Sequence, residues 1–118
     1  MANLRDIAEQ SGIDYAQAMD RFGDNEALYL RLSAKFSDDP HFDALEQALA
    51  TEDFFTAQRE VHSLKGVAGN LSFLALYETS CSVNDALRAD DIQAVNALMP
   101  TLREEYRRVR DALEAVNG

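Results

Sequence analysis

The chain has 118 residues, and its 21 acidic side chains outnumber 11 basic ones, which gives a formal net charge of −10. This length is typical of one domain, so we expect a single domain over residues 1–118. Binding to nucleic acid or to an anionic membrane surface requires clustered lysine and arginine, which the acidic composition argues against. A single cysteine, Cys81, excludes an intramolecular disulfide. With no signal peptide and no apolar run of about 20 residues, the sequence indicates a cytoplasmic protein without membrane insertion.

Apolar residues recur at intervals of three and four along the chain, and the two-residue alternation typical of strands is absent. The sequence therefore predicts an all-α protein. In chain order, the expected helices cover residues 3–10, 14–22, 25–36, 40–50, 54–71, 76–89 and 91–116. Short connections between long amphipathic helices favour antiparallel neighbours. We therefore expect an antiparallel up-and-down four-helix bundle, built from the last four helices and capped by the short N-terminal ones.

Two details of these helices can be checked against a structure. The third helix is expected to present Leu28, Leu32 and Phe36 as its apolar stripe. Pro100 lies inside the last periodic stretch, where we expect a kink in a continuous helix rather than a break.

The segment from Phe54 to Leu71, FFTAQREVHSLKGVAGNL, combines a regular core stripe with unusual residues on its other side. The stripe consists of Phe54, Ala57, Val61, Leu64, Ala68 and Leu71. At about 100° per residue, His62 lies about 140° from the centre of the stripe, Gly66 roughly opposite it, and Gly69 about 120° away. The residues of this outward face are Gln58, Arg59, His62, Lys65, Gly66 and Gly69.

Gly66 and Gly69 need a reason to lie inside a helix. Each glycine costs a helix interior about 0.8–1.0 kcal/mol relative to alanine, and close packing against a neighbouring helix is the usual compensation. Their spacing instead turns both away from the core stripe. We therefore expect them to leave room for another molecule to approach the imidazole of His62.

His62 and Lys65 together have the chemistry of a phosphoryl-accepting site. Their Cβ atoms are expected about 5–6 Å apart, so the ammonium group of Lys65 favours the neutral, nucleophilic imidazole over the protonated one. The same cation offsets the negative charge of a phosphoryl group carried by the ring. Both properties suit a histidine that attacks phosphorus and holds the product.

The stretch HSLKGVAGNLSFLAL, from His62 to Leu76, resembles the signature of histidine-containing phosphotransfer (HPt) domains. That signature has a histidine, an apolar residue two positions on, lysine-glycine, a small residue and another apolar one. The resemblance covers nearly the whole chain in helix order and length, although Ser72 stands where the family often has glycine. Upstream residues in familiar places are Arg21, Phe22, Gly23, Asp24, Leu28 and Tyr29.

The resemblance implies a four-helix bundle in which His62 is phosphorylated on Nε2 and exchanges the group with an aspartate of a response-regulator receiver domain. It also implies that Lys65 steadies the phosphoryl group. The Mg²⁺ needed for transfer would belong to the receiver, so no cofactor is expected on this chain. Receiver domains and sensor histidine kinases are the expected partners of a monomer without kinase activity of its own. The expected docking residues are Arg59, Lys65, Gly66, Gly69 and Phe73.

Hairpin symmetry predicts which residues face His62 from the following helix. The turn between the two helices is centred near Phe73, so Asn84 is expected at the height of His62. Asn84 would then accept a hydrogen bond from Nδ1–H and leave Nε2 free for attack, while Arg88 would reach the phosphoryl oxygens and Gln58 would support the site from the same helix as His62. Two alternatives stay open: Asn84 is simply solvated, or Arg88 forms an ion pair with a neighbouring carboxylate.

Two other function classes are also considered. A non-catalytic helical adaptor would keep the bundle and bind a receiver or another protein without being phosphorylated. A small hydrolase or metal-dependent enzyme is poorly supported, because neither histidine lies in a Glu-x-x-His pair. The glycine patterns of nucleophile elbows and phosphate-binding loops are also absent from the sequence. We expect no metal site.

Other conspicuous residues are expected to be structural. His41 follows Pro40 in the first turn of a helix, without a reactive constellation around it. The last helix is expected to form a solvated face with ion pairs at i,i+4 spacing, because basic and acidic residues alternate there. These residues are Arg103, Arg107, Arg108 and Arg110 with Glu104, Glu105, Asp111 and Glu114.

The acidity of the chain is unevenly distributed. Residues 1–53 carry 12 acidic and 4 basic side chains, and residues 78–118 carry 8 and 5. Residues 54–77, which contain His62, have a net charge of +1 from Arg59, Glu60 and Lys65. The segment expected to accept a phosphoryl group is therefore free of the excess negative charge found elsewhere.

Overall fold

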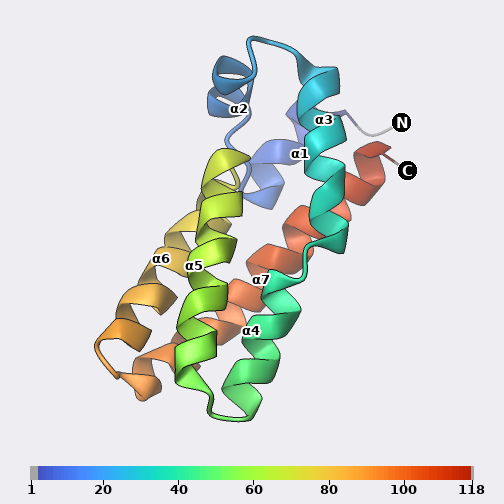
Figure 1. Cartoon of the computed structure of the whole chain (residues 1–118). Coiled ribbons are helices and arrows are strands. Elements are labelled where there is room, and N and C mark those ends of the chain that lie inside the picture. The colour runs from blue at the N-terminus through green and yellow to red at the C-terminus, as the bar shows by residue number, and fades with distance from the viewer. Residues whose placement is uncertain (1–2, 118) are drawn as a thin grey trace.

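The computed structural model describes residues 3–117, and these residues form helices and short connections only, so the predicted all-α fold is confirmed (Figure 1). The elements are α1 (Leu4–Ala8), the 3-10 helix η1 (Glu9–Ser11), α2 (Tyr15–Arg21), α3 (Glu26–Ala34), the 3-10 helix η2 (Lys35–Asp38), α4 (His41–Ala50), α5 (Phe54–Asn70), α6 (Leu74–Arg88) and α7 (Ile92–Asn117).

The predicted up-and-down bundle is made by α4, α5, α6 and α7, in which each helix packs against the next. Three-residue turns at 51–53, 71–73 and 89–91 reverse the chain between them. α7 is the longest element with 26 residues, and its far end packs against α1 and α3. Figure 1 shows α3 continuing the line of α4 beyond the end of that helix, while α1 and α2 lie at the same end of the bundle. The short N-terminal helices therefore cap the bundle.

The three turns share one way of ending a helix. Their middle residues, Glu52, Ser72 and Asp90, have φ angles of 56°, 59° and 55°. The next backbone N–H, such as that of Phe73, then donates to the carbonyl five residues earlier, which satisfies a carbonyl that the helix leaves free. Left-handed backbone favours glycine. Ser72 is therefore a non-glycine residue in a backbone conformation that glycine adopts more readily.

The stripe predicted for the third helix is only partly correct. Phe36 is buried as expected and Leu28 is half-buried, but Leu32 is 37% exposed. Tyr29 and Ser33 of α3 are buried instead. The hydroxyl of Tyr29 donates a hydrogen bond of 2.5 Å to the carbonyl of Leu71 at the end of α5, and burial raises the pKa of Tyr29 to about 12. The hydrogen bond from Tyr29 fixes which side of α3 faces the bundle. The spacing of apolar residues alone does not predict that side.

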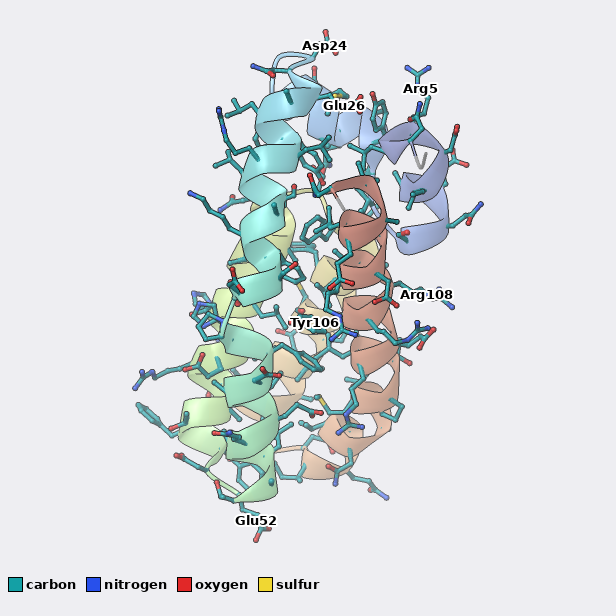
Figure 2. All side chains as sticks on the ribbon, turned by 90° about the vertical axis from the view of Figure 1, so that its right-hand side faces the viewer. Arg5, Asp24, Glu26, Glu52, Tyr106 and Arg108 are labelled. Carbon is teal, nitrogen blue, oxygen red and sulfur yellow. The ribbon has the colours of Figure 1, made fainter. Side chains whose placement is uncertain are left out.

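α7 runs through Pro100 as one helix, so the prediction that proline does not break it is confirmed. Its inner side carries Tyr106, which reaches toward α4 in Figure 2 and stacks on Phe42 with ring centroids 4.1 Å apart. Arg108 lies on the outer side (Figure 2), where its Nε is 3.2 Å from Glu104 at i,i+4 spacing. Arg107 forms a similar i,i+4 pair with an aspartate. The solvated, paired face predicted for this helix is therefore present at these residues. Two others differ from the prediction: Arg103 pairs with Glu46 of α4 at 2.8 Å, and burial raises the pKa of Glu105.

Candidate functional site

α5 begins at a capped N-terminus that sets its register. The carboxylate of Asp53 accepts hydrogen bonds from the backbone N–H of Thr56 at 3.2 Å and from its hydroxyl at 2.6 Å, and these bonds lower the pKa of Asp53. From this start the predicted stripe faces inward, with Val61 and Leu64 fully buried. His62 is consequently exposed on the opposite side.

His62 lies in an open hollow of about 390 Å³ between α5 and α6. Three cationic side chains and no acidic ones contribute to its lining. Within residues 3–117, no hydrogen bond or ion pair engages the imidazole of His62, so both ring nitrogens are free of protein partners. The lining residues are Phe55, Gln58, Arg59, His62, Lys65, Asn84 and Arg88.

The structure brings the two residues expected from α6 to this hollow. Asn84 is only 6% exposed, so the alternative of a solvated side chain is wrong. No hydrogen bond between Asn84 and His62 forms in the described part of the chain, so the expected acceptor for Nδ1–H is not in place. Arg88 is exposed, and within residues 3–117 it forms no ion pair with Asp85 or Glu78. Its guanidinium group is therefore available to an anion at the hollow.

The two glycines of α5 differ in what surrounds them. A Cβ atom added to Gly66 would meet no atom of another described element within 4 Å, so this position is open to an approaching molecule. A Cβ atom on Gly69 would lie 3.1 Å from the ring of Tyr77 in α6. The expectation that both glycines clear a docking surface therefore fits Gly66, whereas the packing of α6 accounts for Gly69.

The placement of Phe73 on the docking surface is wrong, because this residue is fully buried. Its ring packs edge-on against Phe36, with centroids 5.0 Å apart. The N-terminal part of the chain covers the turn between α5 and α6, as shown by the bond from the backbone N–H of Asp14 to the carbonyl of Ser72 at 2.9 Å. A turn residue that is exposed in an isolated hairpin is buried here by a distant segment.

Sequence reasoning missed Phe55, which lines the hollow and is 74% exposed. The available signal was an apolar residue directly after Phe54 but outside the core stripe, seven positions before His62. Seven residues are close to two helical turns, which places both side chains on one face.

His41 also has a partner that was not predicted. Its Nδ1 lies 2.8 Å from Oε2 of Glu60, and the pair ties the start of α4 to the middle of α5. Glu60 is two residues before His62 in sequence but points to the α4 side of the helix, away from the hollow.

Comparison with known proteins identifies the domain to which this geometry belongs. The family model of the Hpt domain matches residues 37–112. The chain is therefore a member of the Hpt domain family. The match runs from η2 through α4, α5 and α6 into α7, so every residue lining the hollow lies inside it. Comparisons with curated proteins and with solved structures gave no match.

Membership of the Hpt family gives the chain a phosphotransfer role in two-component signalling. Over residues 3–117, no group of three or more His, Cys, Asp and Glu side chains is placed to hold a metal ion. Nor is any helix of that part of the Hpt domain long and apolar enough to cross a membrane.

Proposed function

We propose that this Hpt domain is a phosphorelay intermediate in the cytoplasm. It accepts a phosphoryl group on Nε2 of His62 from the aspartate of one receiver domain and passes it to the aspartate of another. The observation that carries this proposal is the environment of His62: an exposed imidazole without a protein partner, in a hollow lined by Arg59, Lys65 and Arg88 and by no carboxylate.

The transfer needs little of the chain beyond this arrangement. The lone pair of Nε2 attacks phosphorus of the aspartyl phosphate, a P–N bond forms, and the P–O bond to the aspartate breaks to restore its carboxylate. The ring is cationic until its Nδ1 proton is released to water. Mg²⁺ bound by the receiver supplies charge neutralisation on the donor side, and passage to the second receiver reverses these steps.

The cations of the hollow act on the charge that arrives with the phosphoryl group. Lys65 is one turn from His62 on the same helix, and Arg88 reaches the hollow from α6. Both donate charge-assisted hydrogen bonds to phosphoryl oxygens, which are roughly twice as strong as neutral ones. Gln58 and Asn84 supply neutral amide groups that support the imidazole or the phosphoryl group. The chain is thus a carrier rather than a kinase.

A labelling experiment tests the proposal. The purified chain is mixed with a receiver domain phosphorylated on aspartate in the presence of Mg²⁺, and the chain is analysed for acid-labile, base-stable phosphate. We expect rapid labelling of the natural chain and none of His62→Gln. A chain that binds the receiver but acquires no label would be an adaptor, and label retained in His62→Gln would place the phosphoryl group elsewhere; either result overturns the proposal.

A further inference from the structure

The large apolar side chains exposed in residues 3–117 are concentrated along two hollows beside α5, one of which contains His62. Three of the four in residues 3–117 line two hollows that meet at Lys65. One is the hollow of His62, with Phe55 in its lining. The other, of about 410 Å³, lies along the later part of α5, with Leu74 and Tyr77 in its lining. The fourth, Leu32, lines neither hollow.

Phe55 is the most exposed of the four, at 74% against 37–39% for the others. It precedes His62 by seven residues, which corresponds to about 10.5 Å along the helix axis and a rotation of about 20°. A specific interface covers about 800 Å² on each partner, a patch with a radius of about 16 Å. A protein whose phosphoaspartate stands over His62 therefore also covers Phe55.

We propose that Phe55 is a docking residue through which this chain engages its receiver domain. This inference rests on the proposed relay function and extends it to the surface that holds the partner. The matching receiver carries an apolar surface about 10.5 Å from its phosphoaspartate, the axial distance from His62 to Phe55. The phosphoaspartate faces the cations of the hollow while Phe55 enters the apolar surface.

Two features favour a receiver domain over other occupants of this surface: its positive charge, and the position of Phe55 in the same hollow as His62. Phe55 and Arg59 line the hollow that contains His62, so the apolar and cationic contacts belong to one surface. The cations suit a partner that presents a phosphorylated carboxylate, whereas a second copy of this acidic chain would bring a net charge of −10 against a chain of equal charge. Aromatic side chains, phenylalanine among them, are enriched in protein–protein interfaces.

The test compares Phe55→Ala with Leu32→Ala, which also removes an exposed apolar side chain but lies in α3, outside both hollows. Initial rates of phosphoryl transfer are measured against the concentration of phosphorylated receiver. For Phe55→Ala we expect the half-saturating receiver concentration to rise about tenfold, with the maximal rate changed by less than about twofold. For Leu32→Ala we expect both values to stay within about twofold of the natural chain.

Phosphoramidate, a small phosphoryl donor that needs no docking surface, separates the two proposals. It should label His62 equally in the natural chain and in Phe55→Ala, and the midpoint of thermal unfolding should show that both are folded. Failure of both donors to label the natural chain would overturn the relay function itself.

Two results would overturn the role of Phe55 while leaving the relay intact. One is an unchanged half-saturating concentration in Phe55→Ala. The other is a natural chain that forms dimers in solution which Phe55→Ala dissolves, because Phe55 would then serve contact between copies.

Discussion

A histidine lies on each of two sides of α5, and the two histidines differ in their surroundings: His41 comes from the start of α4, and His62 belongs to α5 itself. On the α4 side, His41 is held by the carboxylate of Glu60, whose oxygen lies 2.8 Å from Nδ1. On the α6 side, His62 has no protein partner within residues 3–117 and is surrounded by cations. A carboxylate beside an imidazole repels an incoming phosphoryl group, and nearby cations attract it. The same residue type is thus a structural tie on one side and a candidate nucleophile on the other.

The largest expected effect comes from replacing the two histidines one at a time. His62→Gln should abolish acid-labile labelling by a phosphorylated receiver, since the nucleophile is gone. His41→Gln should keep the transfer rate within about twofold, because its partner Glu60 lies outside the hollow. Phosphate counted on each variant after a fixed time checks this. Loss of label in folded His41→Gln would show that phosphorylation of His62 depends on the pair on the α4 side of α5.

Reversing one charge of the hollow should give the next largest effect. Lys65→Glu places beside His62 the kind of group that Glu60 places beside His41. The substitution replaces an attractive positive charge one helical turn from His62 by a repulsive negative one, which makes the approach of a phosphoryl group less favourable. We expect transfer to slow on the order of a hundredfold. The effect should shrink at high salt, because the site is open to solvent.

The matched control for that reversal is Arg110→Glu, which makes the same change in net charge on α7, away from the hollow. It should slow transfer by less than about twofold. Equal slowing in the two variants would mean that the net charge of the chain governs transfer, rather than the charges next to His62.

A third change fills the open space beside His62. Gly66→Gln puts a side chain where a Cβ atom would meet no other element within 4 Å. We expect transfer to slow about tenfold, because the partner is held away from Nε2. The midpoint of thermal unfolding should stay the same or rise, since glycine is the poorer helix former.

Gly69→Ala is the control for this substitution. Its Cβ atom would face Tyr77 rather than the partner, so transfer should remain within about twofold of the natural rate. A Gly66→Gln variant that transfers at the natural rate would refute the idea that this glycine provides access.

Much of the site could be predicted because it depends on local periodicity. The apolar spacing of α5 determines that Val61 is buried and His62 exposed, and hairpin symmetry places Asn84 opposite. Phe73 shows where this reasoning ends. The residue is buried by Phe36, a contact across 37 positions of the sequence that no local pattern encodes.

Contacts between helices account for the other differences between the sequence predictions and the structure. The packing of Gly69 on Tyr77 and the pair between His41 and Glu60 both depend on how α4, α5 and α6 are rotated against one another. A helical wheel shows only that Glu60 lies off the core stripe, and not which neighbour it reaches. The position of Phe55 differs for the opposite reason: it lies outside the core stripe and stays largely exposed at the hollow of His62.

The smallest effect is expected on the α4 side. Glu60→Gln removes the charge that holds His41, in a pair whose side chains are 18% and 31% exposed. Pairs this accessible contribute about 0.2–1 kcal/mol, so the free energy of unfolding should fall by no more than about 1 kcal/mol. A double-mutant cycle with His41→Gln should assign most of that loss to the interaction between the two residues. Transfer to His62 should not change, because Glu60 faces away from the hollow. If Glu60→Gln alters the transfer rate without altering stability, the charge of Glu60 acts through α5 on His62, and the two sides of the helix do not work independently.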